Sequence, residues 1–208
     1  YCLDNQDVAG QLAADVQTLG FSAKMAGYSE HQPGGDLSDF LTNYDGRALL
    51  LVTDNFFKSA GCVFNLLNQV QRLAEQNRLT VVVSDGRKLS EDGKSWEAVP
   101  TAFDRVSNVI QYMNHWQDQY LELRRQRRQH EDDRLLEEKI ETTRRVSSEV
   151  GELLRFLRNQ PVFTVEGIRR NSYKAFIPWS TGEIKIEELG EIQAVPAAIQ
   201  ATAPFVLQ

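Results

Sequence analysis

Two short apolar runs constrain the fold of this chain most strongly. One is ALLLV at residues 48–52, within a strand predicted over 47–53, and the other is TVVV at residues 80–83, within a strand predicted over 79–84. Neither run alternates with polar residues, so we expect both faces of each strand to be covered. Strands of this kind are typical of a parallel sheet with helices on its two sides.

Helical periodicity precedes and separates the two runs. After a cap at Asp4 or Asn5, apolar residues recur at helical spacing until Gly20 ends the pattern: Val8, Leu12, Val16 and Leu19. A second helix is predicted over 55–77, with a buried stripe of Val63, Phe64, Leu67, Val70 and Leu73. The helix pattern therefore alternates with the strands along the chain.

Two weaker strand signals complete this part. Residues 21–26 form a short strand candidate, followed by a loop over 27–35 and a short helix that begins at Asp36 or Ser38. Residues 1–3 resemble the end of a buried strand, so we expect a few further strand residues before Tyr1. The resulting order predicts a doubly wound, mainly parallel sheet of four or five strands.

A long helical region follows a polar loop predicted over 88–97. Pro100 marks a helix start, and apolar spacing continues to Tyr120, stops in the charged stretch 124–134, and resumes from Leu136 to Leu157. This pattern fits either one very long helix or a helical hairpin bent near 129–133. We therefore divide the chain into a domain over 1–158 that includes this helical extension, and a C-terminal segment over 159–208. In that segment, 173–179 and 183–189 flank Ser180-Thr181-Gly182 as a β-hairpin would.

Composition excludes several classes of function. The net charge of −6 argues against binding to nucleic acid or to an anionic membrane, because both need a basic face. Two cysteines are too few for a disulfide framework and fit a reducing, cytoplasmic compartment. No apolar run approaches the length of a bilayer span. His31, His115 and His130 are scattered without ligand spacing, so no metal site is expected.

In a doubly wound sheet, ligands bind beyond the carboxyl ends of the strands. The positions predicted there are Asp4, residues 27–36, residues 54–59 and residues 85–87. No GxGxxG or Walker motif occurs, and Gly34-Gly35 is too short to cradle a phosphate, so we interpret it as a loop.

The stretch TDNFFKSAGCVFNLL at 53–67 closely resembles the region after the third strand of bacterial TIR (Toll/interleukin-1 receptor) domains. In that family the strand ends in Ser/Thr-Asp, an aromatic pair follows, and a Ser-x-x-Cys-x-x-Glu motif opens the next helix. The matching residues here are Thr53, Asp54, Phe56, Phe57, Ser59 and Cys62. The opening YCLDNQD is similar to the family's first strand and turn, and the loop after the second strand lies where the family has its BB loop. Tyr112, Trp116 and Tyr120 resemble a Tyr-x-x-x-Trp-x-x-x-Tyr helix of prokaryotic members.

The resemblance covers residues 1 to about 158 and implies a flavodoxin-like TIR fold with one of two activities. Some TIR domains cleave NAD at the nicotinamide–ribose bond, and others only bind fellow TIR domains. The resemblance implies NAD contacts at Asp4, Tyr28, Phe56, Phe57, Ser59 and Cys62. Cleavage builds positive charge on the ribose, which a carboxylate on the following helix would stabilise.

This sequence departs from the family at that carboxylate, because Asn65 occupies the Glu position three residues after Cys62. An amide carries no charge and cannot act as a base. The loss of such a group typically costs on the order of 10²–10³ in rate. Glu30, Asp36 and Asp54 are other acids near the same crevice, but no spacing places them on the ribose. Efficient NAD hydrolysis is therefore not expected, although NAD binding stays open.

Several motifs also have simpler interpretations. Cys62 could be an activated thiolate, but a small buried filler is the favoured interpretation. Phe56 and Phe57 could line a ligand pocket or staple a helix to the sheet. The arginines at 124–128 lie beside five acids and indicate a solvated helix face. The stripe of Trp116 and Tyr120 is interpreted as core.

The sequence thus predicts an α/β signalling module acting by homotypic TIR–TIR assembly as a homo-oligomer, in bacterial defence or stress response. The alternative is an NAD glycohydrolase that works despite Asn65. A flavodoxin-like receiver domain is a weaker rival, because the acidic pair after the first strand and the Lys after the last strand are absent.

Overall fold

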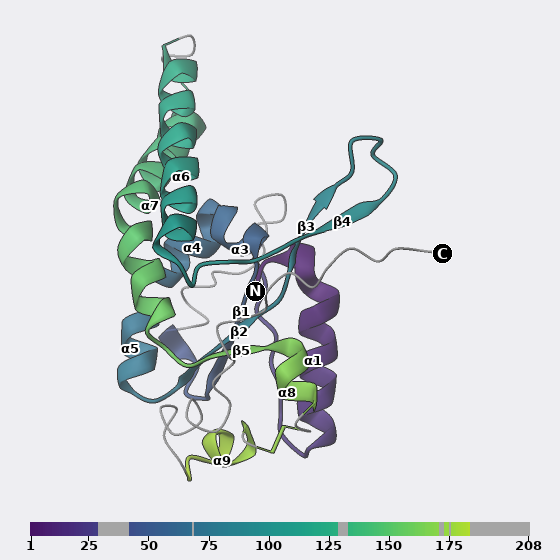
Figure 1. Cartoon of the computed structure of the whole chain (residues 1–208). Coiled ribbons are helices and arrows are strands. Elements are labelled where there is room, and N and C mark those ends of the chain that lie inside the picture. The colour runs from purple at the N-terminus through teal and green to yellow at the C-terminus, as the bar shows by residue number, and fades with distance from the viewer. Residues whose placement is uncertain (29–41, 68, 129–132, 171–172, 175, 184–208) are drawn as a thin grey trace.

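The computed structural model describes residues 1–28, 42–67, 69–128, 133–170, 173–174 and 176–183, and Figure 1 shows their arrangement. Its centre is a parallel sheet of three strands. The strand β1 (Ala48–Val52) pairs with β2 (Leu79–Val83), which pairs in turn with β5 (Val162–Thr164). Both predicted central strands and their parallel pairing are confirmed. Among the described residues the parallel sheet has three strands, not the four or five expected.

Side chains of β1 and β2 alternate between two hydrophobic clusters, so both faces of the sheet are covered. Val52 and Val81 belong to a cluster with α3 (Asp54–Lys58), α4 (Ala60–Leu67), α5 (Val70–Glu75) and the two long helices. Leu51 and Val82 belong to a cluster on the other face, with α1 (Gln6–Thr18) and α8 (Val165–Arg170). The doubly wound arrangement follows from these two clusters.

The helix predicted over 55–77 is divided into α3, α4 and α5. Ser59 has an extended backbone (ψ 117°) and ends α3. Its hydroxyl accepts a hydrogen bond of 3.4 Å from the Cys62 amide three residues on, as an N-cap side chain does. The division shifts the buried stripe, because Leu66 is buried whereas Phe64 and Leu67 are only partly buried.

The long helical region is a hairpin, which decides between the two arrangements left open by the sequence. The helices α6 (Val106–Arg127) and α7 (Arg134–Arg158) pack side by side along most of their length (Figure 1). The carboxylate of Asp133 caps α7 by accepting a hydrogen bond of 3.1 Å from the Leu136 amide. Gly151 leaves room for Met113, whose sulfur would lie 3.0 Å from an added Cβ.

Two predictions for the N-terminal half are wrong. Residues 21–26 form no strand; one isolated parallel bridge joins Cys2 to Tyr28, next to the short 3-10 helix η1 (Leu3–Asn5). The loop predicted over 88–97 is largely an antiparallel hairpin of β3 (Gly86–Leu89) and β4 (Trp96–Val99), which projects from the body of the molecule (Figure 1). Both strands are largely exposed and contain no continuous apolar run of the kind that marks β1 and β2, so they have no such signal in the sequence.

The C-terminal segment contributes to the same core as the rest of the chain. Residues 162–164 form β5 beside β2, so the segment expected over 159–208 shares the sheet with the first part. The strand predicted over 173–179 is wrong, because Phe176–Thr181 form the helix α9. The indole of Trp179 is buried against the α1 face of the sheet, a long-range contact that overrides the local β signal. Most of the second predicted hairpin strand, over 183–189, lies outside the described residues.

Candidate functional site

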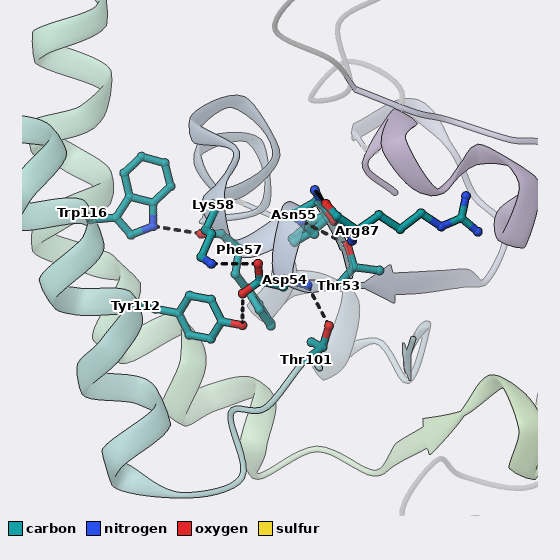
Figure 2. A network of polar contacts seen from close by, with 10 residues as sticks. Thr53, Asp54, Asn55, Phe57, Lys58, Arg87, Thr101, Tyr112 and Trp116 are labelled. Atoms are coloured by element: carbon teal, nitrogen blue, oxygen red, sulfur yellow. Dashed lines mark hydrogen bonds and ion pairs between the residues drawn. The ribbon is translucent and has the colours of Figure 1, made fainter. Parts of the chain in front are cut away.

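The carboxyl end of β1 begins a network of polar contacts that Figure 2 shows from close by. Thr53 follows the strand, is buried, and caps α3 by accepting a hydrogen bond of 3.1 Å from the Phe56 amide. The amide of Asp54 donates to the Thr101 hydroxyl at 2.7 Å. These two bonds fix the direction in which the chain leaves the strand.

Asn55 ties this end of β1 to the hairpin that follows β2. Its side-chain nitrogen donates to the Arg87 carbonyl at 2.8 Å, and its side-chain oxygen accepts from the Arg87 amide at 2.6 Å (Figure 2). Gly86 allows this approach, because a Cβ there would lie 2.7 Å from the Asn55 oxygen and 2.7 Å from the Asp54 Cβ. Arg87 in turn donates to Asp7 of α1 at 2.6 Å, and this bond lowers the pKa of that carboxyl.

Asp54 has both carboxylate oxygens occupied by donors. One accepts a hydrogen bond of 2.8 Å from the Lys58 ammonium, and the other accepts one of 3.1 Å from the Tyr112 hydroxyl of α6 (Figure 2). Burial and the Asp54 charge raise the pKa of Tyr112, so its hydroxyl stays a donor at neutral pH. One turn further along α6, the indole of Trp116 donates to the Phe57 carbonyl at 2.9 Å.

Two sequence motifs that resemble the TIR family separately are therefore in direct contact. The Asp-x-Phe-Phe turn after β1 and the Tyr-x-x-x-Trp stripe of α6 form one joint, which we call the α6 latch: Asp54, Phe57, Lys58, Tyr112 and Trp116. The Phe57 ring is buried, with its centroid 5.1 Å from that of Tyr112. The latch has no local sequence signal, because its partners are more than fifty residues apart. The sequence predicts the stripe of Trp116 and Tyr120 as core: Trp116 is buried, whereas Tyr120 is only partly buried.

Asn65 is half-buried on α4, and its side-chain nitrogen bonds within its own helix. Its side-chain nitrogen donates to the Gly61 carbonyl at 2.8 Å, four residues earlier. A side chain engaged in this way does not present a charge or a base to a ligand.

The residues predicted to contact NAD lie in different surroundings, and Cys62 lies in the core. Cys62 is fully buried, its sulfur lies 4.0 Å from the Tyr28 carbonyl, and Gly61 leaves space for the Tyr28 ring. Cys2 lies in the same place, and its thiol donates to Asp4 at 3.5 Å. A hydrogen bond with Cys62, together with burial, raises the pKa of the Cys2 thiol. Cys2 is therefore a protonated thiol at neutral pH. The interpretation of Cys62 as a buried filler is confirmed.

The two phenylalanines differ. Phe57 packs between Phe103 and Tyr112 beside α6, whereas Phe56 lines a cavity of about 350 Å³ that Phe57 does not reach. The cavity reaches Tyr1 and Cys62, but Asn65, Ser59 and Asp54 do not line it. The structure therefore brings together Tyr1, Phe56 and Cys62 and leaves Asn65 outside. Glu30, Asp36 and most of the expected BB loop lie outside the described residues.

Searches for relatives identify no family: the chain matches no family model, no curated protein and no solved structure. Across the described ranges no group of three or more His, Cys, Asp or Glu side chains could hold a metal ion. None of the helices in those ranges is long and apolar enough to cross a membrane.

Proposed function

We propose that this chain is a TIR-like module that acts by assembling with other copies and does not hydrolyse NAD efficiently. The observation that supports the absence of efficient NAD hydrolysis is the hydrogen bonding of Asn65. The family's ribose-facing carboxylate is replaced by a neutral amide, and that amide is bonded to its own helix at 2.8 Å. The parallel sheet and the latch between the two family-like motifs support the family assignment.

An exposed apolar pair on the β3–β4 hairpin supports assembly. Leu89 and Trp96 are cross-strand partners, and they are 51% and 64% exposed. The hairpin projects from the body of the molecule (Figure 1), and the exposure of the two side chains leaves them accessible to another molecule. Trp is one of the residue types enriched at the hot spots of protein–protein contacts. We infer that this pair contributes to the contact between copies.

The assembly role is tested with Trp96→Ser. We expect the variant to weaken self-association by at least about 30-fold, which is the effect of losing a contact worth about 2 kcal/mol. Sedimentation velocity over a concentration series measures it. Leu135→Ser is the matched control, because Leu135 is also an exposed apolar residue (70%) but lies on α7. Equal association of all three proteins, or a chain that stays monomeric at high concentration, would contradict the proposal.

The catalytic alternative is tested by following nicotinamide release from NAD. We expect no release above background from the unmodified chain, with or without induced assembly. Asn65→Glu restores the carboxylate, and a gain of about 10² in rate would show that the rest of the NAD site is intact. Turnover by the unmodified chain that disappears in Asn65→Ala would favour the glycohydrolase instead.

A further inference from the structure

The helix α6 carries apolar side chains on two faces. One face packs against the rest of the molecule and holds the buried residues Val109, Tyr112 and Trp116. The other face is open to solvent, where Val106 is 63% exposed and Ile110 is 47% exposed. A helix at the surface of a protein needs one apolar stripe to pack against its core. The contacts of α6 within the described chain therefore do not account for the second face.

The second face has the spacing of a coiled-coil interface. Its positions recur at intervals of four and three residues over about five helical turns, and we call them the α6 seam: Val106, Ile110, Met113, Gln117, Tyr120 and Arg124. Met113 packs beside Gly151 of α7 and is still 36% exposed. Leu121, next to the seam, is 45% exposed. This spacing lets the side chains of a second helix fit between those of the first.

The position of α6 leaves the seam accessible to a second helix. Figure 1 shows the α6–α7 hairpin extending away from the sheet, with its far end beyond the other labelled elements. The helix α7 packs along another side of α6. Within the seam only Tyr120 is partly buried, and the other five residues are exposed. A partner helix can therefore lie along the seam without displacing α7.

Charges at the two ends of the seam favour an antiparallel partner. The Arg124 guanidinium lies 5.8 Å from the centroid of the Tyr120 ring and forms no ion pair with a described residue. At the other end, the exposed carboxylate of Asp104 precedes α6 and lies 3.8 Å from the exposed Arg105. A parallel copy of α6 would place Arg124 against a second Arg124, whereas an antiparallel copy would place it close to Asp104. The seam is therefore complementary to a reversed copy of itself.

We propose that two copies of this chain associate through their α6 seams, as an antiparallel helix pair related by a two-fold axis near the middle of α6. The inference rests on the proposed assembly function and adds a contact separate from the one at Trp96. In this arrangement Val106 of one copy packs against the Arg124 side chain of the other, and Met113 packs against Gln117. The aliphatic stem of an arginine can cover an apolar residue while its charge stays in solvent.

Two features of the seam suit reversible pairing of like chains. The residues that flank it on the solvent side carry no charge, so pairing brings no like charges together there: Ser107, Asn114 and Leu121. Gln117 is a polar residue at a position that a stable coiled coil fills with an apolar one, and such a residue weakens pairing while it fixes the register. The dimer is therefore expected to be weak and to dissociate on dilution.

The substitution Ile110→Glu tests the seam, because it places a carboxylate where pairing would remove the charge from water. We expect the dimer dissociation constant, measured by sedimentation velocity over a concentration series, to rise by at least about 30-fold. Gln111→Glu is the matched control, because it adds the same charge at an exposed position outside the seam. It should change the constant by less than about 3-fold. Urea unfolding of both variants at low concentration shows whether the monomer keeps its fold.

Cysteine cross-linking tests the orientation, and it also covers the case in which Ile110→Glu does not fold. The proposed axis brings Asn114 beside its own counterpart, whereas Ser107 lies about two helical turns from the axis. Under mild oxidation by air with a copper–phenanthroline catalyst, we expect Asn114→Cys to form disulfide-linked dimers at least about 10-fold faster than Ser107→Cys. Because Cys2 and Cys62 are buried, the unmodified chain should form none. Equal rates for the two variants, or no linked dimer from either, would overturn the proposal.

The outcomes for the seam and for the assembly role can be told apart. Association that is lost in Trp96→Ser but unchanged in Ile110→Glu would overturn the seam and leave the assembly role in place. Association that is lost in Ile110→Glu, and kept in Gln111→Glu, would support the seam whatever Trp96→Ser does. A chain that stays monomeric at high concentration would overturn both.

Discussion

The carboxyl end and the outer edge of β1 differ in how many of their groups have partners within the protein. At the carboxyl end, both oxygens of Asp54 and both polar atoms of the Asn55 amide have protein partners. At the outer edge, β1 has no second strand neighbour in the described part of the chain, and the partly buried Ala48, Leu49 and Leu50 line a cavity of about 350 Å³. A polar group that is fully bonded within the protein has little capacity left for a ligand, whereas a cavity has space for added atoms. The carboxyl end is therefore a structural joint, and the outer edge borders open space.

The largest expected effect is at the joint. Trp116→Ala removes a side chain that is 3% exposed and leaves the Phe57 carbonyl without its donor. We expect the free energy of unfolding in urea to fall by about 3–5 kcal/mol. Trp96→Ala is the matched control, because Trp96 is 64% exposed, and it should change the stability of the monomer by less than about 0.5 kcal/mol. Similar losses in both variants would contradict a packed latch.

A smaller effect is expected where α4 meets Tyr28. A Cβ at Gly61 would lie 2.0 Å from the Tyr28 ring, so Gly61→Ala forces the ring to move. We expect a loss of about 1–3 kcal/mol, measured by urea unfolding. Gly10→Ala on α1 is the control, since nothing lies within 4 Å of its Cβ, and it should stabilise by about 0.5–1 kcal/mol through helix propensity. Equal effects at the two glycines would show that the Tyr28 contact is loose.

The cavity of about 350 Å³ should respond to added volume in the opposite direction. Ala13 lies on α1 and lines this cavity, so Ala13→Leu places apolar carbon atoms in open space. We expect the unfolding free energy to rise by about 0.5–1 kcal/mol, since one buried methylene contributes about 0.8 kcal/mol. The thermal midpoint gives an independent measurement. A destabilisation of the size expected for Gly61→Ala would mean that the cavity is already filled.

The smallest effect is a pH dependence beside the latch. Burial, followed by the nearby Lys58 charge, holds the pKa of His115 below its usual value, while Asp54 and Asp118 act in the opposite sense. Protonation therefore favours the unfolded chain. The stability is present above the unfolded pKa of about 6.5 and is lost as the pH falls below it. Because His115 is partly exposed and solvent screens its charge, the change is about a few tenths of a kcal/mol.

His115→Gln should remove this dependence. The unfolding free energy of each protein is measured at pH 7.5 and at pH 5.5. We expect it to fall less between the two pH values in His115→Gln than in the unmodified chain. An unchanged slope in His115→Gln would assign the pH dependence to other groups, such as Asp7 beside Arg87.

The elements that sequence reasoning predicted are those with a long or uniform apolar pattern. The β-branched run of β2 identified a buried parallel strand, and the spacing from Val146 to Leu157 identified α7. The elements it missed are short. β5 has three residues, and α9 has six residues of a sequence that favours a strand locally. Their state is decided by the surfaces they contact, because so few residues carry little intrinsic preference.

The properties of the candidate site also fall into two kinds, those that the sequence predicts and those that depend on the tertiary structure. The sequence by itself predicted strands at 48–52 and 79–83 and favoured Cys62 as a small buried residue, because these properties depend on residue type and local spacing. Only the tertiary structure decided that Asp54 bonds Tyr112 across 58 residues, that Asn55 holds Arg87, and that β1 pairs only with β2 among the described residues. Hydrogen-bond partners and strand neighbours distant in sequence are selected by the packing of whole elements, and no local pattern specifies them.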